Sequence, residues 1–83
     1  MTIAVVLATH GQAAKALLAT AEMIIGEQDN VCCIDFMPGE NGEVLAEKIR
    51  QALPSLDTSQ GLLLLVDLWG GTPFHASSKI AEE

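Results

Sequence analysis

Three short apolar runs, each followed by a stretch with helical character, constrain this chain more than any other feature of its sequence. The runs IAVVL, VCCIDF and GLLLLV occupy residues 3–7, 31–36 and 61–66. They are rich in apolar residues and hardly alternate with polar ones, which is typical of strands that are buried on both faces of a sheet. Strands that alternate with helices predict a parallel sheet with right-handed crossovers.

The segments between the runs predict the helices. Residues 12–25 carry their apolar side chains on one helical face, and Gly26 follows as a C-terminal stop. Residues 43–53 repeat this pattern and end before Pro54. Both segments are long enough to cross over from one parallel strand to the next.

A third helix is predicted after the last apolar run. Thr72 is expected to cap it, with Pro73 at its first position, and the printed sequence ends inside it. The predicted fold class is therefore α/β, with an open parallel sheet that has helices on both faces in the order β-α-β-α-β-α. Residues 1–83 make a single domain.

The charge of the chain narrows its range of partners. Acidic residues outnumber basic ones by eleven to four, so the formal net charge is −7 at pH 7. Such a surface repels nucleic acid and anionic lipid, and it favours a basic protein partner. No apolar run approaches the ~18 residues that a membrane span needs, and the start of the chain lacks the features of a signal peptide. A cytoplasmic location is expected.

Candidate functional residues gather at the carboxyl ends of the predicted strands, where open parallel sheets place their sites. His10 and Gly11 follow the first run, at the start of a helix whose amides favour an anion. Asp67 ends the third run, at the same carboxyl edge of the predicted sheet. A carboxylate against one ring nitrogen of a histidine selects the tautomer and leaves the other nitrogen as a nucleophile.

A second glycine-bearing helix start lies in the segment GGTP, residues 70–73. The amides of Gly11, Gly71 and Thr72 and the Thr72 hydroxyl predict a nest for phosphate oxygens. The segment lacks the Lys-Ser/Thr ending of a Walker loop, and no GxGxxG indicates a dinucleotide. Two such helix starts around a histidine and a carboxylate favour transfer of a phosphoryl group, with no metal and no cofactor.

Each of these residues also has a purely structural interpretation. His10 can be an exposed or capping histidine, Asp67 a turn cap, and the glycines an ordinary strand-to-helix turn. His75 is interpreted as a surface or packing residue. Trp69 either covers the site, anchors a partner or simply packs.

The stretches TIAVVLATHG, DFMPGEN and LLVDLWGGTPF resemble the mannose-type IIA domain of the bacterial phosphoenolpyruvate-dependent sugar phosphotransferase system. The resemblance implies a phosphohistidine carrier in which His10 is phosphorylated, Asp67 hydrogen-bonds its ring and Thr72 stands at a hydroxyl position near the site. It also implies the phosphocarrier protein HPr as donor and a histidine of a IIB domain as acceptor. Through IIB, it implies an indirect link to membrane permease subunits.

The domain that the chain resembles continues beyond residue 83, with a further parallel strand and a C-terminal strand exchanged within a dimer. We therefore expect the chain to be truncated before the last strands, to expose its third strand as an apolar edge, and to form a homo-oligomer. The predicted function is that of a phosphoryl carrier between HPr and IIB. The alternatives are an α/β regulatory module that binds a phosphorylated ligand without turnover, and an inactive truncated relative.

Overall fold

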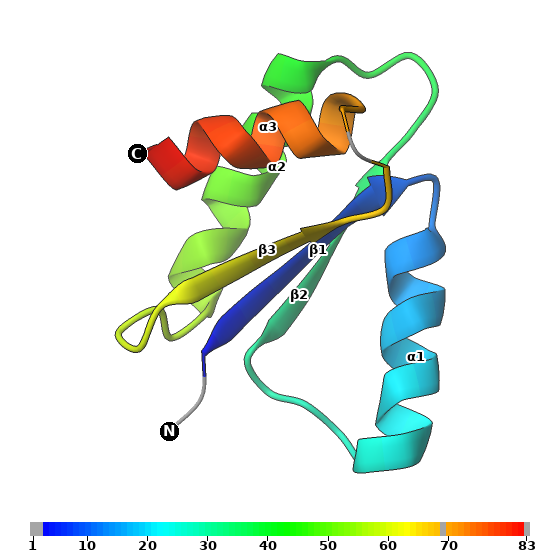
Figure 1. Ribbon diagram of the computed structural model, residues 1–83, viewed down its shortest axis with the longest axis vertical. Coiled ribbons are helices and arrows are strands. Elements are labelled where there is room, and N and C mark those ends of the chain that lie inside the picture. Colours follow the sequence, from blue (N-terminus) through cyan, green and yellow to red (C-terminus); the bar gives the residue numbers. More distant parts are fainter. Residues whose placement is uncertain (1–2, 69, 83) are drawn as a thin grey trace.

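A computed structural model describes residues 3–68 and 70–82 of the chain as a parallel sheet with flanking helices (Figure 1). The strands are β1 (Ala4–His10), β2 (Val31–Phe36) and β3 (Leu62–Val66). Their order in the sheet is β2-β1-β3, and both pairings are parallel. The predicted open parallel sheet is confirmed, with the first strand at its centre.

The helices lie on both faces of this sheet, as predicted. The helix α1 (Ala13–Ile25) packs on β1 and β2 from one side, whereas α2 (Gly42–Ala52) and α3 (Thr72–Glu82) pack against each other on the other side (Figure 1). A 3₁₀ turn, Leu53–Ser55, ends α2 at the proline that the sequence marks as a stop. None of the helices in the described residues has the length and apolar character that a membrane crossing requires.

The first strand is longer than the apolar run that predicts it. Two polar residues continue the ladder, because Thr9 pairs with Asp35 and His10 pairs with Phe36 on β2. The neighbouring strand thus supplies backbone partners beyond the last apolar residue. As a result His10 is the final residue of β1, at the carboxyl edge of the sheet.

The starts of α1 and α3 depend on residues outside the helices. The buried hydroxyl of Thr9 accepts a hydrogen bond of 2.8 Å from the Ala14 amide in the first turn of α1. The Gly71 carbonyl accepts from the His75 amide at 3.0 Å, so the ladder of α3 begins at Gly71. Thr72 is therefore the first residue of α3, which corrects the prediction that Thr72 precedes the helix.

The main hydrophobic core lies between the sheet and the α2–α3 pair. Buried apolar side chains from β1, β2 and both helices meet there. They are Val6, Ala8, Ile34, Leu45, Ala46, Ile49, Ala76 and Ile80. Each large side chain that is fully buried contributes about 1.5–3 kcal/mol relative to an exposed one, so this layer contributes strongly to the stability of the fold.

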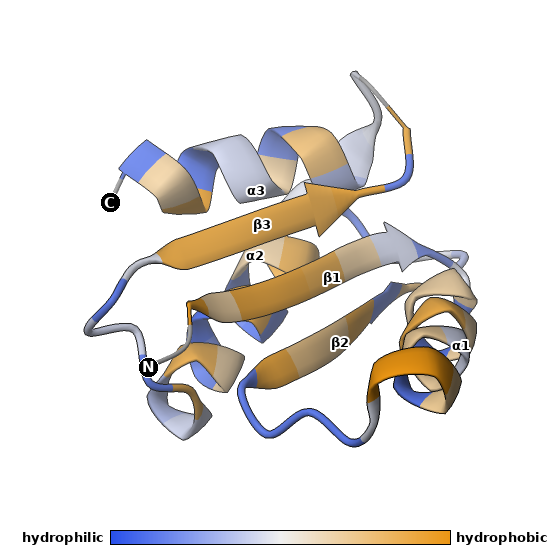
Figure 2. Ribbon diagram, turned by 60° about the horizontal axis from the view of Figure 1, so that its bottom comes forward, coloured by the Kyte–Doolittle hydropathy of each residue, from blue (hydrophilic) through white to orange (hydrophobic). Residues whose placement is uncertain are grey.

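The opposite face of the sheet is covered less completely. Leu63 and Leu65 of β3 are 48% and 43% exposed, and the strand is strongly apolar along its length (Figure 2). The predicted apolar face of α1 is also only partly buried, since Ala14 is fully covered while Leu17 and Ile24 are 55% and 78% exposed. In the described part of the chain, β3 is therefore an apolar edge strand, as expected.

Candidate active site

The sheet brings His10 and Asp67 together from positions 57 residues apart in the sequence. His10 ends β1, and Asp67 directly follows β3, the parallel neighbour of β1. One oxygen of the Asp67 carboxylate, Oδ1, lies 3.2 Å from Nδ1 of the His10 ring, and the other, Oδ2, accepts a 3.2 Å hydrogen bond from the His10 backbone amide. The carboxylate thus bridges the ring and the main chain of one residue.

This contact defines the state of the imidazole ring. A carboxylate is only an acceptor when it is ionised, so Nδ1 of His10 carries a hydrogen, and in the neutral ring Nε2 carries the lone pair. The His10 side chain is 43% exposed, so the ring is open to a reacting partner. His10 therefore combines a fixed tautomer with an accessible nucleophilic nitrogen.

The environment also favours the ionised form of Asp67. Burial acts against ionisation, but hydrogen bonds from the His10 ring, the His10 amide and its own backbone amide, together with the His10 charge, outweigh it and lower the pKa of Asp67. A carboxylate that accepts several hydrogen bonds holds its charge in this way. Asp67 is thus a negative charge in contact with the ring near neutral pH.

Phe36 supports the imidazole from the side of β2. Its ring meets that of His10 edge-on, with centroids 5.6 Å apart and an interplanar angle of 79°. Its carbonyl oxygen accepts a 2.8 Å hydrogen bond from the Gly11 amide. Gly11 has a φ of 58°, a left-handed conformation that suits glycine at this strand-to-helix turn.

Gly71 lies close to the Cε1 atom of the His10 ring. A Cβ atom at this position would lie 3.2 Å from Cε1 of His10 and 3.3 Å from Cδ2 of Leu68. The amide of Gly71 donates to the Leu68 carbonyl at 3.1 Å. The absence of a side chain at Gly71 therefore gives the imidazole its space.

These contacts bear on the predicted phosphate nest, which stays a prediction. The amides of Gly11 and Gly71 donate to the carbonyl oxygens of Phe36 and Leu68 in this structure, where they hold the two turns. At Gly71 the missing side chain also leaves space beside the His10 ring. Thr72 stands next to Gly71 as the first residue of α3, where its hydroxyl and the helix N-terminus remain candidates for phosphate binding.

A cavity of about 290 Å³ opens beside the ring. It is lined by His10, Gly11 and the loop that follows β2, from Phe36 through Glu40. The sequence places this loop directly after a strand, at the carboxyl edge where sites occur, but it marks no residue of the loop as a site residue. Its position after β2 was the signal that could have indicated a role for Phe36.

Two further predicted positions can be placed or set aside. His75 is exposed on α3, and its ring contacts that of Phe74 edge-on at 5.5 Å, in agreement with a surface residue. Trp69 lies outside the described residues. Within residues 3–68 and 70–82, no group of three or more histidine, cysteine or acidic side chains is placed to hold a metal ion.

Comparison with known proteins connects this geometry to a family. The model of the family described as "PTS system fructose IIA component" matches residues 4–83. The chain is 61% identical over 80 residues to the mannose-specific EIIAB component of the phosphotransferase system of Escherichia coli K12, covering 96% of the chain and 25% of that protein. It is 37% identical over 81 residues to the fructose-specific EIIA component of Bacillus subtilis, covering 98% of the chain and 56% of that protein.

A solved structure agrees with the fold. The crystal structure of the phosphotransferase system component EIIA from Streptococcus agalactiae aligns with a TM-score of 0.85 at 28% identity. The alignment covers 98% of this chain and 60% of that one. The chain thus spans a quarter of the Escherichia coli protein and just over half of the Bacillus subtilis protein. With its matching sequence over residues 4–83 and its matching sheet, the chain belongs to the mannose-type family of IIA components of the phosphotransferase system.

Proposed function

We propose that this chain carries a phosphoryl group on Nε2 of His10, taking it from phosphorylated HPr and passing it to a histidine of a IIB domain. The observation that carries the proposal is the contact between Nδ1 of His10 and the Asp67 carboxylate, which leaves Nε2 as the free nitrogen of a side chain that is 43% exposed. A sugar permease would then receive the group from IIB. Under this proposal the transfer takes place in the cytoplasm.

The chemistry needs no external acid or base. The Nε2 lone pair of His10 forms a bond to phosphorus as the bond between phosphorus and the donor histidine breaks, and that electron pair returns to the donor ring. Because Nδ1 keeps its proton, the His10 ring gains positive charge, which the Asp67 carboxylate stabilises. Transfer to IIB reverses these steps, and the ring returns to its neutral form.

The start of α3 is a candidate for holding the phosphoryl oxygens. Gly71 brings this helix end against the ring, and Thr72 follows it with a hydroxyl donor. A helix N-terminus favours a negative group. Phosphoryl transfer depends mainly on such positioning and charge stabilisation, so Thr72 is the residue that we propose for phosphate contact, with Gly11 and Gly71 providing room.

Intact mass spectrometry with phosphorylated HPr tests the proposal. The wild-type chain should gain the mass of one phosphoryl group, in an acid-labile form that peptide mapping assigns to His10. The His10→Gln variant should gain none, while His75→Gln should be labelled like the wild type. Added IIB domain should then discharge the label.

Other outcomes favour the alternatives. Label on His75, or undiminished labelling of His10→Gln, would overturn the assignment of His10. A chain that binds phosphorylated HPr without a change in its own mass would be a binding module rather than a carrier. No labelling of the folded chain at any donor concentration would make it an inactive relative.

A further inference from the structure

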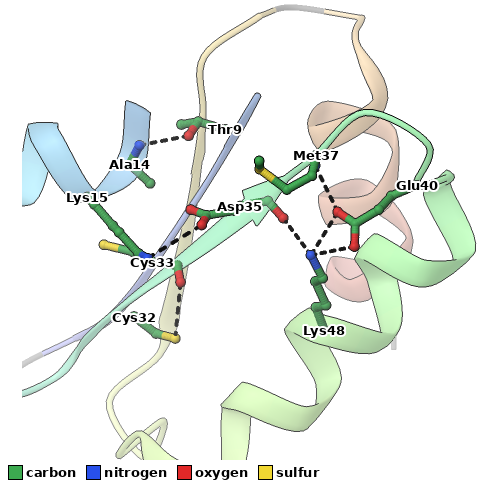
Figure 3. A network of polar contacts seen from close by, with 9 residues as sticks. All are labelled: Thr9, Ala14, Lys15, Cys32, Cys33, Asp35, Met37, Glu40 and Lys48. Atoms are coloured by element: carbon green, nitrogen blue, oxygen red, sulfur yellow. Dashed lines mark hydrogen bonds and ion pairs between the residues drawn. The ribbon is translucent and has the colours of Figure 1, made fainter. Parts of the chain in front are cut away.

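We propose that Glu40 and Lys48 are positioning residues that hold Phe36 against the His10 imidazole. The inference deepens the proposed carrier function and rests on it. It starts from the network at the carboxyl end of β2, which links this strand, the loop after it and the second turn of α2 (Figure 3). Neither residue contacts His10 directly in the network, so they act through Phe36.

Lys48 reaches from α2 to both sides of the loop. Its Nζ donates to the backbone carbonyl of Asp35 at 3.0 Å and to Oε1 of Glu40 at 2.8 Å, and it lies 2.6 Å from Oε2 of Glu40 (Figure 3). The side chains of Lys48 and Glu40 are only 35% and 22% exposed. A charge-assisted contact that is partly shielded from water is stronger than a surface pair.

Glu40 in turn holds the first residue of the loop. Its Oε1 accepts a 2.8 Å hydrogen bond from the Met37 amide, and its own amide donates to the Met37 carbonyl at 3.1 Å. The pair formed by Glu40 and Lys48 therefore fixes the main chain at Asp35 and at Met37. Phe36 lies between these two residues, so its backbone is held on both sides.

Phe36 passes this constraint to the reacting residue. Its ring packs edge-on against the His10 ring, and its carbonyl accepts from the Gly11 amide. Asp67 holds the imidazole from β3, whereas Phe36 holds it from β2. In a carrier, Nε2 must point along the line on which the phosphoryl group moves. The contact with Phe36, in addition to that with Asp67, limits rotation of the ring away from that line.

The substitution Lys48→Met tests the inference, with Lys79→Met as its matched control. Both remove one lysine charge, so the effect on encounter with a charged donor is similar, but Lys79 is an exposed residue of α3. At saturating phosphorylated HPr we expect Lys48→Met to slow phosphorylation of His10 about tenfold, because small misplacement of a reacting group is costly. Lys79→Met should stay near the wild-type rate, and Lys48→Arg, which keeps the cation, should recover most of the loss.

Nitrogen-15 NMR of the His10 ring gives a second readout that needs no donor. The wild type should show one sharp set of ring nitrogen resonances, and Lys48→Met should show shifted or broadened ones, because Phe36 no longer limits the motion of the imidazole, while circular dichroism remains that of the folded chain. If Lys48→Met does not fold, Glu40→Gln serves instead, because its amide oxygen still accepts from Met37 while the charge is lost. An unchanged saturating rate together with an unchanged ring spectrum in the folded variant would overturn the inference.

The two proposals can fail separately. If the wild-type chain takes no phosphoryl group, the carrier function fails, and the ring spectrum alone still decides whether Glu40 and Lys48 position His10. If the wild type is labelled and Lys48→Met is labelled equally fast, the carrier function stands and the positioning role is wrong. A higher KM at an unchanged saturating rate would also overturn positioning, because it would indicate donor binding instead.

Discussion

Asp67 contacts His10 at two atoms, with Oδ1 3.2 Å from Nδ1 of the ring and Oδ2 3.2 Å from the backbone nitrogen. The second contact ties the carboxylate to the main chain at the end of β1, so that the first contact orients the ring relative to the sheet. A carboxylate bound only to the ring could move with it. The two contacts together keep the ring from turning and keep its proton on Nδ1.

Replacing Asp67 by asparagine should slow transfer while leaving the fold intact. An asparagine oxygen can still accept from the ring, but it supplies no charge, and its NH₂ group can favour the wrong tautomer. A rate loss of about 10²–10³, equivalent to ~3–4 kcal/mol, is the expected order for removal of such stabilisation. Rapid-quench measurement of His10 labelling checks this.

The matched control for that change is Asp57→Asn. Asp57 lies in an exposed loop and accepts hydrogen bonds from Ser59, two residues away. Loss of the Asp57 charge should leave the transfer rate within about twofold of the wild-type rate, since substitutions of exposed surface residues have small effects. Equal rates for both variants, with folding confirmed, would mean that Asp67 only caps the turn.

Replacing Gly71 by alanine should disturb the ring more than the fold. The new Cβ would lie 3.2 Å from Cε1 of His10, so the half-exposed imidazole must move by a few tenths of an ångström. A transfer rate lower by roughly tenfold follows from the loss of alignment. Gly42→Ala is the control, because its Cβ would meet Thr72 Cγ2 at an ordinary 3.7 Å. Identical transfer rates for the two alanine variants would contradict a role for the space at Gly71.

Partner encounter should depend on salt. The chain has a formal net charge of −7, and a basic donor surface would be attracted to it. Salt screens such fields over about 8 Å at physiological ionic strength. The labelling rate at subsaturating HPr should therefore fall as salt rises, whereas the saturating rate should change little. A flat response at subsaturating donor would exclude electrostatic steering.

The contact between Glu40 and Lys48 predicts a pH-dependent contribution to stability. Hydrogen bonds from the Lys48 ammonium group and the Met37 amide lower the pKa of Glu40, and with the Lys48 charge they outweigh the opposite effect of burial. Because the folded pKa lies below the unfolded value of about 4.3, the stabilisation is complete above that value and is lost as pH falls through the folded pKa. The difference in unfolding free energy between wild type and Glu40→Gln should therefore be larger at pH 6 than at pH 3.

Urea unfolding at the two pH values measures that difference. Glu47→Gln is the control, because Glu47 is 56% exposed and pairs with Arg50 on the surface of α2 at 3.2 Å. Such exposed pairs contribute little, at most about 1 kcal/mol. If the difference in unfolding free energy between wild type and Glu40→Gln increased as the pH is lowered, this would contradict a depressed pKa of Glu40 in the folded chain.

The exposed edge of the sheet predicts self-association of the 83-residue chain on its own. The strand β3 is apolar and unpaired on one side in the described structure, with Leu63 and Leu65 about half exposed. Flat apolar edges pair with other chains. Sedimentation equilibrium should show oligomers that Leu65→Lys disrupts, while Ile24→Lys on the exposed side of α1 should not. A wild-type monomer that melts cooperatively above about 60 °C would show that the edge is tolerated.

The order of elements and the principal pair of the site could be predicted from the sequence. Unbroken apolar runs such as residues 61–66 identify buried strands because their composition leaves few alternatives, and the helical spacing between them implies parallel crossovers. His10 and Asp67 follow from this, since carboxyl ends of neighbouring parallel strands must meet at one edge. What the resemblance added was the identity of the transferred group and of the partners.

Only the tertiary structure decided which atoms around His10 are engaged. The sequence predicts an anion-binding role for the amides of Gly11 and Gly71, and the structure shows that these amides donate to the carbonyls of Phe36 and Leu68. An amide is free only if the fold brings no carbonyl oxygen within about 3 Å of it. That distance cannot be worked out from the spacing of residues in the sequence. The same holds for the network through Glu40 and Lys48, because a helix residue and a loop residue meet there only after α2 packs against β2.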